Sequence, residues 1–237
     1  MRLTEALKAV VPQRAGQRVR LAQARVFEAF GSQRYSAPGL RGLDKKLLRY
    51  ISAEPGVFLE IGANDGFSQS NTYYLERVLG WDGVLIEAVP SLFRSCRKLR
   101  KHSVTFNRAC VGPDGPAHID IALLGLMSVA LGLQDNGEET DRLGRRPPRT
   151  ITVPTATLSE LIDQAGKTSI DFMSVDVEGA ELAVLSGLDL SRHVPGFLLV
   201  ETKHPDQVAE LLGEQMEFVE ALSEHDFLYR RHEAPAT

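Results

Sequence analysis

The stretch "FLEIGANDGF", residues 58–67, decides how the rest of the sequence is interpreted. An apolar run ends at Gly62, and Asn64, Asp65 and Gly66 follow within four residues. Glycine weakens a strand interior, but it suits places where the backbone turns with positive φ or lies close to another group. The stretch therefore predicts a buried strand that ends in a tight turn, where something approaches the backbone.

Around this stretch, apolar runs alternate with helical patterns. The predicted strands are 57–61, 83–88, 103–110, 170–177 and 196–204, and the predicted helices are 68–80, 90–99, 157–166, 180–188 and 206–215. Residues 217–231 predict a closing antiparallel hairpin that turns near residues 223–225. Such alternation is typical of an α/β fold with a mostly parallel sheet and helices on both faces. In these sheets ligands bind outside the carboxyl ends of the strands, which here means just after Ile61.

Two segments fall outside this alternation. Residues 1–54 show mainly helical patterns, and the leucines of "LRGLDKKLLRYI" (40–51) recur every three or four positions. Residues 111–150 predict a short hairpin followed by a long polar loop, and such loops are usually functional or disordered. We expect a helical extension over 1–41 and one α/β domain over 42–237, with 111–150 inserted in it as a cover for the substrate.

Composition excludes several classes of protein. The chain has 237 residues, a net charge of −4 and two cysteines without CxxC spacing, so neither a disulfide scaffold nor a structural zinc is expected. No apolar run is long enough to span a membrane, and no basic stripe indicates a nucleic-acid partner. We expect a cytoplasmic protein without stable membrane insertion. Its first thirty residues are basic, which leaves open an anionic surface, a protein partner such as a second copy in a homodimer, or a solvated helix face.

Acidic residues flank the glycine turn. Glu60 precedes it and Asp65 lies within it, where they would repel a diphosphate but favour a cationic ligand. S-adenosylmethionine carries an ammonium, a sulfonium and a ribose. The alternative is a tight strand-to-helix turn with no ligand. Glu87 ends the second strand about 20 residues beyond the turn, the place where an acid accepts hydrogen bonds from ribose hydroxyls; it could instead be a satisfied strand-end carboxylate.

More acids follow the fourth and fifth strands. Asp176, Glu178 and Glu181 lie in "SVDVEGAEL" (174–182), and acids this close must hydrogen-bond, share protons or face a cation. Alternatively, these acids simply precede and begin a helix, where negative charge is mildly stabilising. This alternative explains Asp176 least well, because Asp176 falls within the predicted strand.

"VETKH" (200–204) adds Glu201 and His204, which should lie beside Asp176 at the mouth of the same crevice. His204 or Asp176 is a candidate general base, with Glu178 as the group that orients it. Asp176, Glu178, Glu201 and His204 could alternatively hold Mg²⁺ or Mn²⁺, although no spacing is diagnostic and a metal-free site is favoured.

Four segments together resemble the FkbM-type family of S-adenosylmethionine-dependent methyltransferases. They are "FLEIGANDGFSQSNTYYLE", "GVLIEAVP", "NRACVG" and "IDFMSVDVEGAELAVLSGLD", and the resemblance runs from about residue 42 to 231. It implies a Rossmann-like seven-stranded sheet with a reversed final hairpin. It also implies methylation of a hydroxyl group, often on a sugar of a glycan, glycolipid or natural product.

The resemblance also assigns roles to residues. Glu60, Gly62, Asn64 and Gly66 would line the methionine part of the cofactor, with Ser70 and Asn71 nearby. Glu87 would hold the ribose, and Arg108, Ala109 and Cys110 would frame the adenine. Asp176 and Glu178 would lie near the sulfonium and the acceptor. Residues 1–40 and most of 123–150 lie outside the resemblance.

Other functions remain open. A nicotinamide oxidoreductase would need the G-x-G-x-x-G pattern that this loop lacks, and its acids would oppose the dinucleotide. A cofactor-binding module without catalysis and a methyltransferase for a carboxyl or amine acceptor are further alternatives. Within 123–150, the side chains of Met127, Leu131 and Leu133 could form an apolar underside of an acceptor lid. Four arginines, Arg142, Arg145, Arg146 and Arg149, could recognise an acceptor phosphate or carboxylate.

Overall fold

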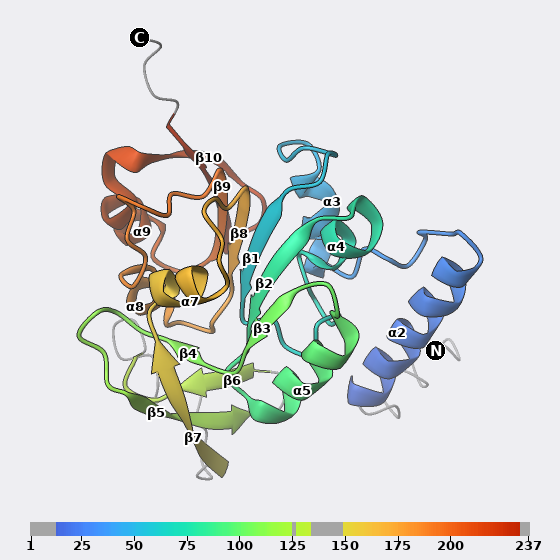
Figure 1. Ribbon diagram of the computed structural model, residues 1–237, viewed down its shortest axis with the longest axis horizontal. Helices are drawn as coiled ribbons and strands as arrows, with labels where there is room; N and C mark the ends of the chain where they lie inside the picture. Colours follow the sequence, from blue (N-terminus) through green and yellow to red (C-terminus); the bar gives the residue numbers. More distant parts are fainter. Residues whose placement is uncertain (1–12, 125–126, 134–148, 233–237) are drawn as a thin grey trace, which may run out of the picture.

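A computed structural model describes residues 13–124, 127–133 and 149–232 of the chain (Figure 1). Its larger sheet has seven strands in the order β10-β11-β9-β8-β1-β2-β3. The strands are β1 (Val57–Ile61), β2 (Asp82–Ile86), β3 (Val104–Phe106), β8 (Phe172–Val175), β9 (Phe197–Glu201), β10 (Met216–Ala221) and β11 (Asp226–Arg231). Strands β3, β2, β1, β8 and β9 pair in parallel, whereas β11 is antiparallel to both β9 and β10. The predicted mostly parallel sheet with a closing antiparallel hairpin is confirmed.

Helices cover both faces of this sheet. The helices are α3 (Leu43–Leu47), α4 (Tyr73–Leu79), α5 (Pro90–Leu99), α7 (Leu158–Gln164), α8 (Glu181–Leu185) and α9 (Pro205–Leu212), with a 3-10 turn, η3 (Gly213–Gln215), after α9. Leu59 and Ile61 of β1 pack in one core with α7, α8 and α9, while Phe58 packs in the other with α3, α4 and α5. Because both faces of β1 are buried, its sequence is almost continuously apolar.

Strands β4, β5, β6 and β7 form a second, smaller sheet below the first in Figure 1. It has the order β4-β7-β5-β6 and consists of β4 (Ala109–Cys110), β5 (His118–Leu124), β6 (Met127–Ala130) and β7 (Arg149–Ala156). The hairpin predicted after residue 111 is therefore present as β5 and β6. Residues 125–126 and 134–148, which include three of the four lid arginines, lie outside the described residues.

Two sequence predictions in this region were wrong. The strand predicted over 103–110 is divided between the two sheets at Asn107, whose side-chain amide donates to the backbone oxygens of Glu87 and Ala88 at 2.8 Å each. Strand β7 was not predicted at all. It pairs with β4 on one side and β5 on the other, although it contains Pro154, a residue that usually argues against a strand paired on both sides.

The N-terminal segment is less helical than its pattern suggests. Helix α2 (Gln13–Ala29) is present, but the helix predicted over 40–51 is reduced to a 3-10 turn, η1 (Leu40–Gly42), and the five residues of α3. Arg41 and Gly42 take φ values of 52° and 71°, which end a right-handed helix. Ala24 of α2 packs beside Tyr73, and Glu28 pairs with Arg77 at 2.9 Å, so the described part of the extension lies against the α/β domain.

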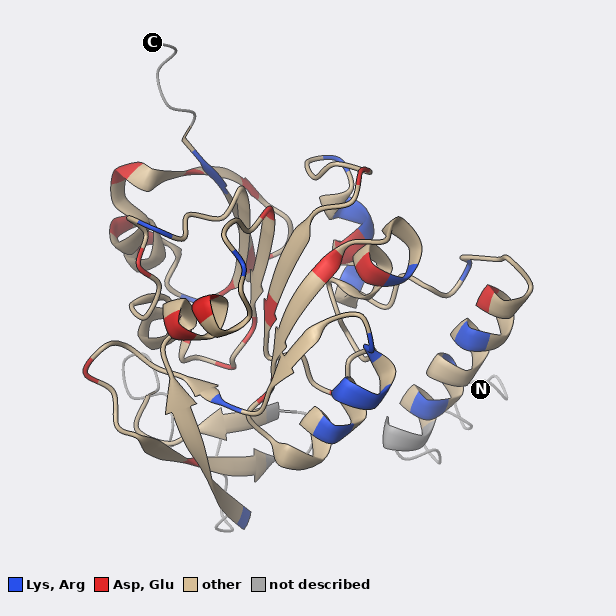
Figure 2. Ribbon diagram, in the orientation of Figure 1, with Lys and Arg blue, Asp and Glu red and all other residues tan. Residues whose placement is uncertain are grey.

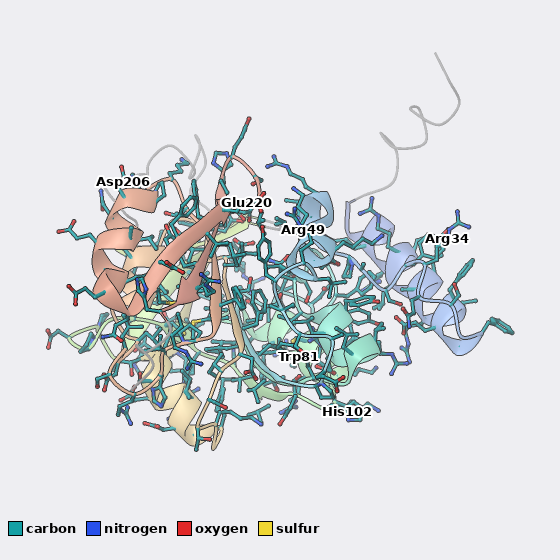
Figure 3. The ribbon with its side chains drawn as sticks, turned by 90° about the horizontal axis from the view of Figure 1, so that it is seen from above. Arg34, Arg49, Trp81, His102, Asp206 and Glu220 are labelled. Atoms are coloured by element: carbon teal, nitrogen blue, oxygen red, sulfur yellow. The ribbon has the colours of Figure 1, made fainter. Side chains whose placement is uncertain are left out.

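The residues after α3 join the N-terminal part of the chain to its C-terminal hairpin. Arg49 forms an ion pair with Glu220 of β10 at 3.2 Å, and the two labelled side chains lie close together in Figure 3. The hydroxyl of Tyr50 also donates to Glu220. Within the described residues, no helix is long and apolar enough to cross a lipid bilayer.

A buried arginine organises the segment between β1 and α4. Arg100 is 1% exposed, and its guanidinium donates to the Glu76 carboxylate at 2.8 Å and to the backbone oxygens of Gly66 at 3.1 Å and Thr72 at 3.2 Å. The Glu60 carboxylate lies 3.8 Å away. One cation therefore compensates two buried carboxylates and two loop carbonyls.

We predict that Arg100→Met destabilises the protein by about 3–5 kcal/mol, because it leaves two buried carboxylates without their cation. Urea unfolding followed by circular dichroism measures the change. Arg97→Met, at an exposed position of α5, the helix that Arg100 follows, is the control and should change stability by less than about 1 kcal/mol. Equal effects of the two substitutions would contradict the role given to Arg100.

Candidate active site

A cavity lies at the carboxyl ends of β1, β2 and β8, and the second sheet forms its opposite wall. Among the predicted site residues it is lined by Glu60, Gly62, Asn64, Ser70, Asn71, Glu87, Arg108, Ala109, Asp176 and Glu178. Four other predicted residues, Asp65, Gly66, Glu201 and His204, are not part of its lining. The structure thus brings together in one cavity most of the residues expected to bind a cofactor.

Gly62 is required by protein packing as well as by its turn. Its φ is 86°, and a Cβ atom at this position would lie 1.9 Å from the backbone oxygen of Asp176. Its amide donates to the backbone oxygen of Ile86 at 3.0 Å. The close approach predicted from sequence is therefore made first by the end of β8, so that three neighbouring strands end in contact at the cavity.

Glu60 lines the cavity and is also held by neighbouring protein groups. Its buried carboxylate accepts hydrogen bonds from the hydroxyls of Ser70 (2.9 Å) and Thr72 (2.7 Å) and from the backbone N–H of Asn71 (2.9 Å), beside the guanidinium of Arg100. Since these groups occupy the carboxylate, Glu60 is not an uncompensated charge awaiting a cationic ligand. It instead shapes residues 70–72 as a wall of the cavity.

Asp65 and Gly66 also face the protein. The Asp65 carboxylate caps the turn, because it accepts from the backbone N–H groups of Phe67 (3.0 Å) and Ser68 (2.7 Å) and from the Ser68 hydroxyl (2.8 Å). A Cβ atom on Gly66 would lie 2.9 Å from the Arg100 side chain. Both residues are therefore held by contacts within the loop, and neither lines the cavity. For the same reason helix α4 begins at Tyr73 rather than at residue 68.

Glu87 lies at the end of β2, as predicted. Its two carboxylate oxygens accept from the backbone N–H groups of Asn64 (2.8 Å) and Val89 (2.7 Å). Burial raises the pKa of Glu87 to about 7, although these two hydrogen bonds act in the opposite direction. Each oxygen keeps a further lone pair, so the ionised side chain can accept additional hydrogen bonds from a ligand in the cavity.

Asn71 presents a buried polar atom without a partner. Its side-chain NH₂ donates to the Ser174 hydroxyl at 3.1 Å, but its Oδ1 atom has no hydrogen-bond partner. The residue is 8% exposed and lines the cavity. An unsatisfied buried acceptor costs about 1–3 kcal/mol, which a ligand with an N–H donor would recover.

Asp176 is surrounded by other acids. Its pKa lies well above the ordinary aspartate value, because it is buried and because Glu201, Glu178 and Glu181 add negative charge around it. A hydrogen bond to Glu201 raises the pKa further, since the protonated Asp176 carboxyl is its donor. Of the sequence interpretations, shared protons and hydrogen bonds therefore describe this cluster better than acids decorating a helix.

The other two acids of the cluster have distinct positions. Glu178 lines the cavity with φ at 59°, a left-handed conformation that is uncommon for residues other than glycine. Glu181 is 3% exposed and accepts from the backbone N–H of Gly179 at 2.8 Å. Glu181 therefore holds the turn after β8, while that turn directs Glu178 to the cavity.

His204 lies outside the cavity lining. It precedes α9 as the N-cap residue, its backbone N–H donates to the Thr202 hydroxyl at 3.0 Å, and it is absent from the cavity lining. In the described part of the chain, no three His, Cys, Asp or Glu side chains converge as a metal site requires. The set of Asp176, Glu201 and His204 considered for Mg²⁺ or Mn²⁺ is thus not arranged as a metal centre.

Comparison with protein families decides how this site is classified. The family model described as the methyltransferase FkbM domain matches residues 60–229, which is most of the chain and includes the whole cavity floor. The chain belongs to the FkbM methyltransferase family. The resemblance inferred from short sequence segments is confirmed. A comparison with curated proteins gives no match.

Solved structures with a similar course of the chain are distant in sequence. The methyltransferase FkbM of Methylobacillus flagellatus is 16% identical with a TM-score of 0.48, covering 86% of this chain and 52% of its own. Fibrillarin of Aeropyrum pernix, solved with bound S-adenosyl-L-methionine, is 12% identical with a TM-score of 0.46, covering 78% and 71%. This FkbM-family chain therefore spans about half the length of the Methylobacillus protein.

Several cavity residues of this FkbM-family chain were not predicted. Ser174, Ile119, Ile121, Ser128 and Ala130 line the cavity as well. Three of them had a signal in the sequence. Ile119 and Ile121 belong to "HIDI" (118–121), which alternates polar and apolar residues as a half-buried strand does, and Ser174 interrupts an otherwise apolar buried strand. Ser128 and Ala130 lie on β6, and the sequence around them shows no such alternation of polar and apolar residues.

We predict that Asp176→Asn stabilises the folded protein, and more so at pH 8 than at pH 5. The raised pKa of Asp176 means that its contribution to stability is largest at low pH and is lost as the pH rises towards its folded value. Asparagine avoids this loss, by up to about 1.4 kcal/mol per pH unit. Chemical unfolding at both pH values measures the difference. A stability gain that is independent of pH would contradict the raised pKa.

Proposed function

We propose that this protein is an S-adenosylmethionine-dependent O-methyltransferase that acts on a hydroxyl group of a sugar in a glycan, glycolipid or glycosylated natural product. The observation that carries the proposal is the unpartnered Oδ1 of Asn71, which lines the same cavity as Glu87 in a chain of the FkbM methyltransferase family. In this proposal the Asn71 amide oxygen would accept from the ammonium group and the Glu87 carboxylate from the ribose hydroxyls.

The residues of the cavity fit this cofactor. Glu87 would accept hydrogen bonds from the ribose hydroxyls with the lone pairs that its backbone contacts leave unused. Asn71 Oδ1 would accept from the ammonium group of the methionine part. Arg108 and Ala109 line the same cavity, where an adenine could pack. Bound S-adenosylmethionine would supply an electrophilic methyl group on a cationic sulfur.

Asp176 is the better candidate for the base that receives the hydroxyl proton. It lines the cavity, whereas His204 does not, and its raised pKa makes it a stronger base than an ordinary aspartate. A cation in the cavity would favour ionisation of Asp176 and so prepare it to accept a proton. Glu178, turned to the cavity by its left-handed backbone, would bind a second hydroxyl of the acceptor.

A base of this kind favours a hydroxyl acceptor over the alternatives. An alcohol is a weak nucleophile that gains about 10²–10⁴-fold from a positioned base. A carboxylate is already ionised and needs no such group. The nicotinamide alternative is disfavoured because the turn after β1, Gly-Ala-Asn-Asp-Gly, lacks the third glycine of a dinucleotide-binding loop.

We predict that calorimetry shows binding of S-adenosylmethionine but not of NAD, and that affinity falls as the pH drops from 8 to 6. The pKa of Glu87 is about 7, and its protonated form loses one acceptor for the ribose. Glu87→Gln should weaken binding about 10- to 100-fold at pH 8 and reduce the pH dependence. Glu54→Gln, on an exposed turn, is the control. Tight binding of NAD without a response to S-adenosylmethionine would refute the proposed function.

We predict that Asp176→Asn lowers turnover about 10²–10⁴-fold while the affinity for S-adenosylmethionine changes only a few-fold, because a base assists the chemical step. His204→Ala should leave turnover nearly unchanged. Mass spectrometry of candidate sugars, scored for the gain of one methyl group, measures turnover. The opposite result, with His204→Ala inactive and Asp176→Asn active, would assign the base to His204. A protein that binds the cofactor but methylates no acceptor would be a binding module.

A further inference from the structure

The cations of the protein are unevenly distributed. Residues 13–27 and 90–110 contain ten arginines and lysines and no acid, although the chain as a whole has a net charge of −4. In space these segments are α2 and the region of α5 and β3, and Figure 2 shows basic positions on both helices. The two segments are far apart in the sequence, so their shared charge is a property of the folded surface.

A second cavity, distinct from the candidate active site, lies between these two helices. Its lining includes Arg25 of α2, Arg77 of α4, and Lys98, Lys101 and His102 at the end of α5. Arg77 is paired with Glu28, and the acid in the lining, Glu76, is already held by Arg100. Within the described residues, no carboxylate pairs with Arg25, Lys98 or Lys101. This cavity therefore has cationic groups available for an anion.

The outer face of α2 is apolar. Val19 is 63% exposed, Val26 is 55% exposed, and Phe30, just after the helix, is 87% exposed. Spacings of seven and four residues place all three on one side of the helix, opposite the buried Ala24. Arg18 and Arg25 lie on one flank of this stripe and Arg20 on the other, as the helical periodicity requires. Exposed apolar residues gathered in this way mark an interaction site.

We propose that α2 and the end of α5 form a docking surface for an anionic lipid bilayer. In this arrangement Val19, Val26 and Phe30 enter the boundary between headgroups and acyl chains, and the flanking arginines reach the headgroups. A headgroup phosphate occupies the cavity lined by Arg25, Lys98 and Lys101. The apolar stripe favours a bilayer over a nucleic acid. Cationic side chains alone suffice to bind the phosphates of a nucleic acid, whereas a bilayer also accommodates exposed apolar side chains.

This mode of binding does not require a membrane-spanning helix, and none is found in the described residues. A helix that lies in the interface needs only a narrow apolar side and basic flanks. The surface is also independent of the proposed methyl transfer, because docking involves neither Glu87 nor Asp176. The vesicle experiment below can therefore fail without affecting the proposed function, and the reverse also holds.

The test is co-sedimentation of the full chain with vesicles of phosphatidylglycerol and phosphatidylcholine, compared with vesicles of phosphatidylcholine alone. We expect binding to the anionic vesicles and a large loss when salt is raised to about 0.5 M, since screening shortens the range of the attraction. The double variant Arg18→Gln/Arg25→Gln should bind about 25-fold more weakly, at about 5-fold per charge. Val26→Ser/Phe30→Ser should weaken binding at least about tenfold.

Matched controls separate docking from loss of folding. Arg192→Gln removes an exposed cation elsewhere, and Phe218→Ser removes an exposed ring from β10; both should bind vesicles as the unmodified protein does. Unfolding midpoints of all variants establish that they fold.

Equal binding to neutral and anionic vesicles would overturn the proposal. Complete displacement from the vesicles by millimolar inorganic phosphate would also overturn it and show a site for free phosphate. Equal loss with the control variants would refute it as well. A dimer that dissociates on Phe30→Ser, without vesicle binding, would assign this surface to a second copy.

Discussion

The ion pair between Glu60 and Arg100 is the interaction on which the site depends. Glu60 belongs to the central strand β1, and Arg100 follows α5, so the contact joins the middle of the sheet to the helix layer that covers it. Between them lie residues 66–72, whose carbonyls and hydroxyls are bound by one partner or the other. Buried charges are stable only when paired and hydrogen-bonded. This requirement gives the segment one conformation, and that conformation presents Asn71 to the cavity.

The buried acids of the protein fall into two groups with opposite electrostatics. Glu60 and Glu76 are compensated by Arg100, and they serve structure. Glu87 and Asp176 have raised pKa values because burial is not offset by a cation, and both line the cavity. Groups with perturbed pKa values in a cleft are typical of functional sites. Among the described residues neither Glu87 nor Asp176 forms an ion pair, although Arg108 also lines the cavity, and both carboxyl groups can therefore interact with a positively charged ligand.

Sequence patterns predicted the main sheet well because its central strands β1, β2, β8 and β9 are largely buried and almost uniformly apolar. The position of Glu87 followed from its distance to the glycine turn. The ion pair of Glu60 with Arg100 did not follow from the sequence, because a carboxylate at a strand end looks the same whether it meets a ligand or a buried arginine 40 residues away. Strand β7 was missed for a local reason, the presence of Pro154. His204 lies outside the cavity lining, and a strand end does not reveal the direction of the side chain at the start of the next helix. The domain boundary at residue 41, the cytoplasmic location and the role of the lid arginines remain predictions.

Residues 104–110 are divided between two sheets, and the cavity therefore has two halves that differ in how well their residues tolerate substitution. One half is built from strand ends whose glycine, asparagine and carboxylates contact one another closely, so a change in any of them disturbs its neighbours. The other half is a small antiparallel sheet that contributes aliphatic and small side chains such as Ile119, Ile121 and Ala130. Residues there can be enlarged or reduced without breaking a hydrogen bond of the first half. Substitution of these few side chains could therefore change which acceptor fits the cavity, while the residues at the strand ends opposite them stay the same.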